Sequence, residues 1–172
     1  STLMNKVFEV IEAKNLFNIS YDKISILTHP YSYIHAIVKF KNGITKILIH
    51  DPNMKIPIFN SIYKNNSIIS SKKLNLNILN NLLLKKVDNK KFPVIKILNN
   101  LPNSSSLYET VLLTINDFYV YKFLENKINF ESLMKLIIKT SSRKHFQKYK
   151  KIKPKKIEDI YELSKYVSLK LT

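Results

Sequence analysis

The segment SSSLYETVLLTINDFYVYKFLENK, residues 104–127, carries a long helical pattern of apolar side chains. Ser106 stands at its start and Glu109 follows three residues later, the spacing at which a serine and a glutamate cap a helix reciprocally. The Tyr and Phe residues between 118 and 123 recur at helical intervals, which predicts core positions and not a stacking platform for bases. The segment therefore predicts a long core helix in the second half of the chain.

Three further helical segments surround this one. FPVIKILNNL (92–101) precedes it, and NFESLMKLIIKTSSRKHF (129–146) and KIEDIYELSKYVSLKL (156–171) follow it. The lysine-rich run at 141–156 is predicted to be a solvated, flexible connection between the last two helices. We therefore expect an all-helical bundle over residues 91–172.

The first half of the chain contains β-prone runs. YIHAIVKF (33–40) and ITKILIH (44–50) are rich in β-branched and aromatic residues, which favour strands. Between them, Asn42 and Gly43 can both adopt positive φ, so this pair predicts a tight hairpin turn. Gly43 is the only glycine of the chain. A shorter β-prone run, ISILT, occupies residues 24–28.

Two less regular stretches complete the organisation. Residues 51–63 begin as a proline-punctuated loop and are predicted to end as a helix. Residues 64–90 are rich in asparagine and low in complexity, which predicts a connector in which KLNLNI (73–78) is strand-like. The predicted fold class is α+β: a small α/β portion with a β-hairpin sheet over residues 1–63, that connector, and an all-helical bundle over 91–172.

The opening segment, STLMNKVFEVIEAKNLF (1–17), predicts an amphipathic helix. Its apolar side chains recur at helical intervals, at Leu3, Val7, Val10, Ile11 and Leu16. Its polar side chains gather along one side, because residues three and four apart are neighbours on a helix surface, at Asn5, Lys6, Glu9 and Glu12. By itself this polar side fits either a solvated face or the floor of a binding site.

Composition limits the class of protein. The chain has 172 residues, 45% of them hydrophobic, which fits one folded domain and excludes a disordered chain. It contains no cysteine, which excludes disulfides and thiol chemistry. No apolar run reaches membrane-spanning length and no signal-peptide pattern opens the chain, so we expect no membrane partner.

The charge is strongly positive, with 29 Lys and Arg against 12 Asp and Glu and a formal net charge of +17. Such a balance raises the question of a polyanionic partner. Arg143 is the only arginine, however, whereas proteins that read phosphates and base edges favour the bidentate fork of arginine. Lys, Asn, Ile, Tyr and Phe are residues of AT-rich codons, so an AT-rich genome explains the charge without a ligand. Nucleic-acid binding is the alternative explanation.

Three blocks of sequence carry a resemblance to a known family. STLMNKVFEVIEAKNLF (1–17), HPYSYIHAIVKFKNG (29–43) and DPNMKIPI (51–58) resemble blocks of the 1-deoxy-D-xylulose 5-phosphate reductoisomerases, in that family's order and spacing. Weaker matches, FPVIK (92–96) and TINDFYVYKFLENKINF (114–130), extend the likeness through most of the helical half.

The resemblance implies an enzyme that converts 1-deoxy-D-xylulose 5-phosphate to 2-C-methyl-D-erythritol 4-phosphate with NADPH and Mg²⁺ or Mn²⁺, in the non-mevalonate isoprenoid pathway. It implies that Asn5 and Lys6 hold the substrate phosphate and that Glu9 is a metal ligand. His35 matches a histidine at the active-site edge, and Met54 matches the methionine that lies against the nicotinamide. An amide beside an ammonium suits phosphate oxygens, and a carboxylate suits a hard cation, so the residue chemistry agrees with these roles.

Several positions depart from the family pattern. Val7 and His50 stand where the family usually has glycine, Asn53 replaces an aspartate, and Leu113 replaces an asparagine. We expect Val7→Gly to cost only about 1 kcal/mol or less through helix propensity. His50 is assigned no role and is interpreted, like His29, as a loop or strand-end histidine.

The chain lacks a glycine-rich dinucleotide-binding fingerprint. The resemblance therefore implies that the nucleotide domain and the other metal ligands precede Ser1, so NADPH and metal binding need that missing N-terminal half. We expect the chain alone to be inactive, and the expected partners are the sugar phosphate, the N-terminal half and a second copy in a homodimer, without a specific nucleic acid. The expected location is the cytoplasm of a bacterium, or a plastid-type organelle in a eukaryote. The alternative is a non-catalytic basic module that binds RNA or an acidic partner through residues 141–156.

Overall fold

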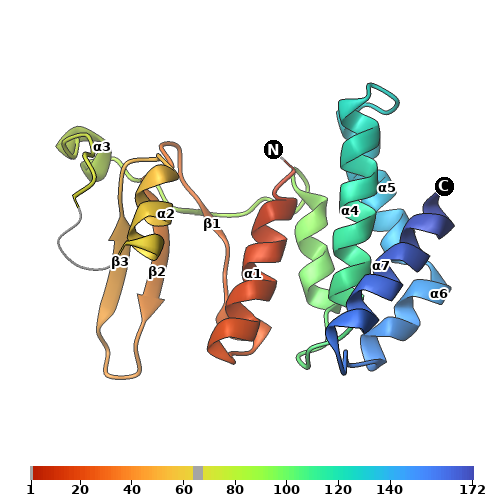
Figure 1. Cartoon of the computed structure of the whole chain (residues 1–172). Helices are drawn as coiled ribbons and strands as arrows, with labels where there is room; N and C mark the ends of the chain where they lie inside the picture. The colour runs from red at the N-terminus through yellow and green to blue at the C-terminus, as the bar shows by residue number, and fades with distance from the viewer. Residues whose placement is uncertain (1, 64–67) are drawn as a thin grey trace. The chain divides into compact units, whose positions relative to one another are not determined.

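The structure is a computed structural model that describes residues 2–63 and 68–172 (Figure 1). The chain divides into two compact units. The helical unit comprises Ser1–Ser25 and Asp88–Thr172, and the hairpin unit comprises Ile26–Val87. The predicted fold class, α+β with a hairpin sheet ahead of a helical bundle, is confirmed. No helix in the described ranges is both long and apolar enough to cross a membrane.

The helical unit is a bundle centred on α4, which packs against both α5 and α7 (Figure 1). The 3-10 helix η2 contacts α1 on one side and α5 on another. The elements of this unit are α1 (Met4–Phe17), η1 (Tyr21–Lys23), η2 (Pro93–Asn100), α4 (Tyr108–Leu124), α5 (Phe130–Ser141), α6 (Lys144–Gln147), η3 (Lys148–Lys151) and α7 (Ile157–Leu171).

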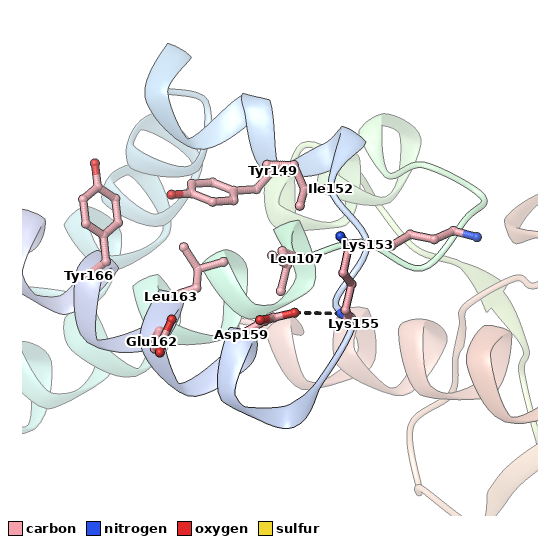
Figure 2. Close-up of a pocket in the computed structure, with 9 residues that line it drawn as sticks. All are labelled: Leu107, Tyr149, Ile152, Lys153, Lys155, Asp159, Glu162, Leu163 and Tyr166. Carbon is pink, nitrogen blue, oxygen red and sulfur yellow. Dashed lines mark hydrogen bonds between the residues drawn. The ribbon is translucent and has the colours of Figure 1, made fainter.

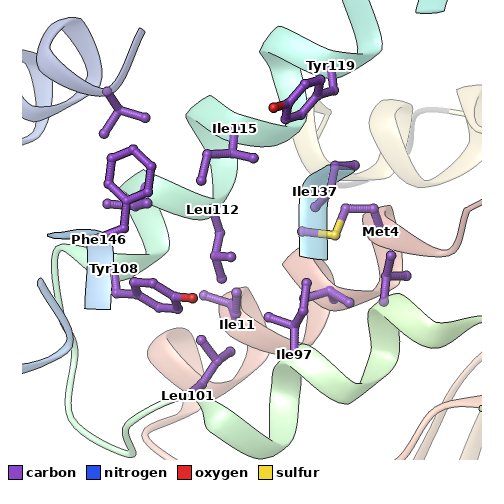
Figure 3. Packing of buried hydrophobic residues seen from close by; sticks show 14 of the residues in the cluster. Met4, Ile11, Ile97, Leu101, Tyr108, Leu112, Ile115, Tyr119, Ile137 and Phe146 are labelled. Carbon is purple, nitrogen blue, oxygen red and sulfur yellow. The ribbon is translucent and has the colours of Figure 1, made fainter. Parts of the chain in front are cut away.

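A single hydrophobic cluster holds this bundle together (Figure 3). Its members come from α1, η2, α4, α5, α6 and α7, so every major helix of the unit contributes to it. Tyr119 is buried in it, as the helical spacing of the aromatic residues predicted, whereas Tyr121 on the same helix is 68% exposed. The fully buried hydrophobic side chains are Val7, Val94, Val111, Leu112, Ile115, Ile137, Phe146 and Val167.

The start of α4 shows the predicted pairing of Ser106 with Glu109. The backbone N–H and the hydroxyl of Ser106 donate to Glu109 Oε2 over 2.8 and 3.2 Å. The backbone N–H of Tyr108 donates in turn to the Ser106 hydroxyl over 3.3 Å. Ser106 and the Oε2 atom of Glu109 thus pair at the point where the helix begins.

The prediction that residues 141–156 form a solvated, flexible connection is wrong. The segment contains α6 and η3, and the side chain of Phe146 is fully buried in the core. Gln147 Nε2 donates to the backbone oxygen of Ser141 over 2.6 Å, which ties α6 to the end of α5. For the same reason the helix predicted over 129–146 is two helices. Because the segment is rich in lysine, the sequence-based prediction overlooked one buried apolar side chain, Phe146, which holds the segment in the core.

The packing of α1 also differs from the predicted division at residues 63 and 90. Met4, Val7 and Ile11 are buried in the cluster of the helical unit, because their shared face packs on η2. Leu16, expected on this apolar face, is 70% exposed. The assignment of residues 1–63 to the catalytic portion of a longer enzyme stays a prediction.

Val7→Gly is therefore expected to destabilise the chain by about 2.5–4 kcal/mol, more than helix propensity alone predicts. Removing a fully buried valine forfeits about 1.5–3 kcal/mol of burial, and glycine in a helix interior adds about 1 kcal/mol. Urea unfolding followed by circular dichroism measures the change. Glu12→Gly, at an exposed position of the same helix, carries only the backbone cost. Equal losses for the two variants would contradict the burial argument.

In its described residues, 26–63 and 68–87, the hairpin unit contains two small antiparallel sheets and two short helices. β1 (Leu27–Thr28) pairs with β4 (Lys85–Lys86), and β2 (Ile34–Lys39) pairs with β3 (Thr45–Ile49). The helices are α2 (Lys55–Ile62) and α3 (Leu76–Asn80). The predicted helix at the end of 51–63 is present as α2. The strand-like reading of 73–78 is wrong, because the Asn75 side chain accepts the backbone N–H groups of Asn77 and Ile78 and caps α3.

The predicted β2–β3 hairpin is confirmed, with Gly43 at φ 88° in the turn. From the turn outward the pairs are regular: Lys39 faces Thr45 and Ala36 faces Leu48. The next pair joins Ile34 to Ile49, so the register shifts by one residue at His35. Such a bulge bends a strand and re-aims the side chains around it.

Candidate functional site

The polar side of α1 brings together the three predicted phosphate and metal residues. Glu9 Oε1 accepts a hydrogen bond from Asn5 Nδ2 over 3.0 Å, and Glu9 Oε2 accepts one from Lys6 Nζ over 2.7 Å. The contacts follow from the helical spacing of three and four residues. Glu12 is exposed on the same helix. An amide, an ammonium and a carboxylate therefore share one surface point.

The first turn of α1 is fixed by its neighbours. The backbone N–H groups of Lys6 and Val7 donate to the Leu3 carbonyl, and Leu3 itself adopts the left-handed conformation at φ 59°. That conformation costs an L-residue about 1–2 kcal/mol, and burial of Met4 and Val7 holds it. Because the apolar face is locked in the core, the polar face must point outward.

The side chains of Asn5, Lys6 and Glu9 can exchange their hydrogen-bond partners for a ligand at a small cost in free energy. The side chains of Lys6 and Glu9 are each 46% exposed, and ion pairs at such positions contribute only about 0–1 kcal/mol. An anionic ligand can therefore take over the two donors while a cation takes over the carboxylate. A hard divalent cation needs several oxygen ligands. In the part of the chain that the structure describes, no three His, Cys, Asp or Glu side chains are grouped to hold a metal ion.

The other two predicted residues lie in the hairpin unit. Met54 immediately precedes α2 and is 63% exposed. His35 lies on β2, and its ring stacks on that of His50 with 3.5 Å between centroids and 5° between planes. His35 Nε2 also lies 3.3 Å from the His50 carbonyl oxygen. Asn5, Lys6 and Glu9 thus share one unit, and His35 and Met54 share the other.

Sequence reasoning missed the contact of His50 with His35. The turn is closed by Phe40 and Ile44, and the regular pairs that follow it, if continued, would place His35 opposite Ile49. In that register His35 and His50 point to opposite faces. In the structure, the shift in register at His35 accounts for the stack.

A second polar cluster lies beside the end of α1. Tyr21 Oη and Glu109 Oε1 are both buried without a hydrogen-bond partner among the described residues. Burial first, and the charge of Glu109 second, raise the pKa of Tyr21 to about 12. The ammonium of Lys14 lies 5.8 Å from the Tyr21 ring centroid. The phenol therefore stays neutral at physiological pH and anchors the segment that follows α1.

The helical unit also has an open groove of about 460 Å³ along α7 (Figure 2). Tyr149, Leu163 and Tyr166 give it apolar walls, and Asp159 accepts the backbone N–H of Lys155 at one end, over 2.7 Å. That hydrogen bond and the neighbouring one from Lys156 lower the pKa of Asp159. None of the five predicted site residues lines this groove.

Comparison with known proteins identifies the family. The sequence model described as the DXP reductoisomerase C-terminal domain matches residues 49–168. The 1-deoxy-D-xylulose 5-phosphate reductoisomerase of Pelagibacter ubique (strain HTCC1062) is 54% identical over 173 residues, which cover 100% of this chain and 45% of that protein. The reductoisomerase of Sulfurihydrogenibium sp. (strain YO3AOP1) is 36% identical over 86% of this chain and 40% of that protein. The chain thus spans less than half the length of these curated relatives.

Comparison with solved structures points to the same family. A 1-deoxy-D-xylulose 5-phosphate reductoisomerase from Zymomonas mobilis, in complex with NADPH, matches 98% of this chain and 44% of that one, with a TM-score of 0.81 and 28% identity. A DOX-P reductoisomerase in complex with NADPH, fosmidomycin and magnesium matches 98% of this chain and 42% of that one, with a TM-score of 0.85 and 26% identity. The chain therefore belongs to the 1-deoxy-D-xylulose 5-phosphate reductoisomerase family and corresponds to its C-terminal part.

Proposed function

We propose that this chain forms the substrate- and metal-side part of an enzyme that converts 1-deoxy-D-xylulose 5-phosphate to 2-C-methyl-D-erythritol 4-phosphate with NADPH. The observation that carries the proposal is the cluster of Asn5, Lys6 and Glu9 on the outer face of α1. It occurs in a chain whose whole length aligns with a reductoisomerase at 54% identity. The likeness to structures that contain NADPH and magnesium supports the choice of cofactors.

In this proposal, Lys6 supplies a positive charge and Asn5 supplies an amide donor to the substrate phosphate. Glu9 supplies one carboxylate ligand to Mg²⁺ or Mn²⁺. When bound, such a metal polarises a carbonyl and stabilises the charge that develops on oxygen during the rearrangement. His35 lies at the edge of the active site, and Met54 offers an exposed apolar side chain to the nicotinamide.

The other groups that the proposed reaction needs are supplied by the N-terminal half of the proposed enzyme. Further metal ligands and a nucleotide-binding domain belong to the N-terminal half of the proposed enzyme, so the chain alone is inactive. The complete enzyme is a homodimer in the cytoplasm of a bacterium, in line with the bacterial source of the relatives. The alternative, a basic binding module that uses residues 141–156, gains no support from the family match.

A chimeric enzyme tests the proposal. The part of the Pelagibacter ubique relative that precedes its aligned 173 residues is joined to this chain, which replaces that aligned part. We expect NADPH oxidation that requires both 1-deoxy-D-xylulose 5-phosphate and Mg²⁺ or Mn²⁺. The chain alone and the upstream part alone serve as controls and should show no turnover. A folded chimera that binds NADPH but leaves the substrate unchanged would overturn the proposal.

A further inference from the structure

The register shift in the β2–β3 hairpin places two histidines on the same side. Without the shift, His35 would face Ile49 and Ile34 would face His50, which puts the two histidine side chains on opposite faces. In the observed register Ile34 pairs with Ile49, so His35 is the extra residue of a bulge. The alternation of side chains between the two faces is interrupted there, and His35 lies on the same side as His50. The backbone N–H of His50 then donates to the Tyr33 carbonyl over 3.2 Å, which continues the pairing past the bulge.

Two contacts then hold the His35 ring in one orientation, and a third holds the ring of His50. Its face lies on the face of the His50 ring, 3.5 Å between centroids and 5° from parallel. Its Nε2 lies 3.3 Å from the His50 carbonyl oxygen, which can only accept, so Nε2 carries the proton. His50 Nδ1 lies 2.6 Å from the Asp51 carbonyl oxygen and is the donor there by the same argument. The His50 ring is thus held by its own neighbour while it supports His35.

We propose that His50 is a positioning residue that orients the His35 imidazole and sets its tautomer for the reaction. This inference rests on the proposed function only in taking His35 as an active-site residue. His35 lies on β2 and His50 directly follows β3, so the pair is built within one hairpin. A ring at position 50 is required for the stack, while the backbone oxygen of that position supplies the hydrogen bond whatever its side chain.

The stack itself is tested by NMR of the imidazole protons of the 172-residue chain. In a stacked pair, the ring current of one imidazole shifts the carbon-bound protons of the other upfield. We expect His50→Ala to move the His35 signals downfield toward those of an unstacked histidine, and His145→Ala, at an exposed histidine of the helical unit, to leave them unchanged. His50→Phe supplies a stronger ring current and should move them further upfield, which gives a test even where the alanine variant does not fold. His35 signals that respond to none of the changes at position 50 would overturn the proposal.

The positioning role is tested in the chimeric enzyme. We expect His50→Ala to lower kcat about tenfold to 100-fold while the KM for NADPH changes less, because a misplaced group costs mainly the chemical step. His50→Phe, which can still stack, should recover most of the loss. His35→Ala combined with His50→Ala should be no worse than His35→Ala alone, since the second residue acts through the first.

The outcomes separate the two proposals. An inactive parent chimera contradicts the proposed function, and the NMR result then decides the stack on its own. An active parent chimera in which His50→Ala stays within about twofold of the parent kcat overturns the positioning role and leaves the proposed function standing. Additive losses from His35→Ala and His50→Ala would also overturn it, because they would show that His50 acts independently of His35.

Discussion

Glu9→Gln is expected to lower the kcat of the chimeric enzyme about 100-fold or more, with the fold unchanged. Glutamine keeps the shape of the side chain and one accepting oxygen, so it can keep the hydrogen bond from either Asn5 or Lys6, but it removes the anionic metal ligand. Metal ions contribute several kcal/mol of transition-state stabilisation, and each 1.36 kcal/mol lost is about tenfold in rate. Steady-state assays over a range of Mg²⁺ and Mn²⁺ concentrations measure the loss.

Glu12→Gln is the matched control for this prediction. It removes the same charge from the same helix one turn further along, at an exposed position, and should leave both kcat and the metal dependence nearly unchanged. Circular dichroism should show the same unfolding transition for Glu9→Gln as for the parent, because the Glu9 side chain is solvent-accessible. If Glu9→Gln retains nearly full activity at limiting metal, the polar side of α1 is a solvated face.

Phe146→Ala is expected to destabilise the chain by about 3–5 kcal/mol, the usual cost of truncating a buried phenylalanine in a core. Its ring is fully buried where α6 meets α4, in the segment whose composition suggests a loop (Figure 3). A loss of this size is a large share of the stability of a small domain. Urea unfolding monitored by circular dichroism should show a lower midpoint.

The control for Phe146→Ala is Lys144→Ala, an exposed position of the same short helix that should change stability by about 0.5 kcal/mol or less. The two variants differ in burial, so the comparison isolates the core contribution of the aromatic ring. A Phe146→Ala variant as stable as the Lys144→Ala variant would mean that α6 does not dock in solution, and residues 141–156 would then be the connection that the sequence predicts.

Local signals in the sequence predicted the elements that depend on local contacts. Gly43 marked the hairpin turn, where it adopts positive φ. The Ser106 and Glu109 pair marked the start of α4, and the spacing on α1 correctly placed Asn5 and Lys6 beside Glu9.

Features that depend on contacts between distant segments of the chain could not be predicted from local sequence patterns. The unit to which α1 belongs is decided by its packing on η2, about 80 residues further along, and no local pattern encodes that choice. The burial of Phe146 depends on its packing against α4, and the lysines that surround Phe146 along the chain gave no indication of that burial. The stack of His35 on His50 depends on a one-residue slip in pairing, which alters no residue type.

The helical unit is assembled from two stretches of chain that are separated by residues 26–87. Helices α4 to α7 are contiguous in sequence, so their contacts close short loops, whereas α1 must close a long one before it reaches η2. We therefore expect α1 to dock late during folding, after the contiguous helices have packed. Substitutions on α1 should then mainly accelerate unfolding and hardly slow folding. Because Asn5, Lys6 and Glu9 lie on this late-docking helix, a capacity to bind phosphate or metal would appear only in the last step of folding.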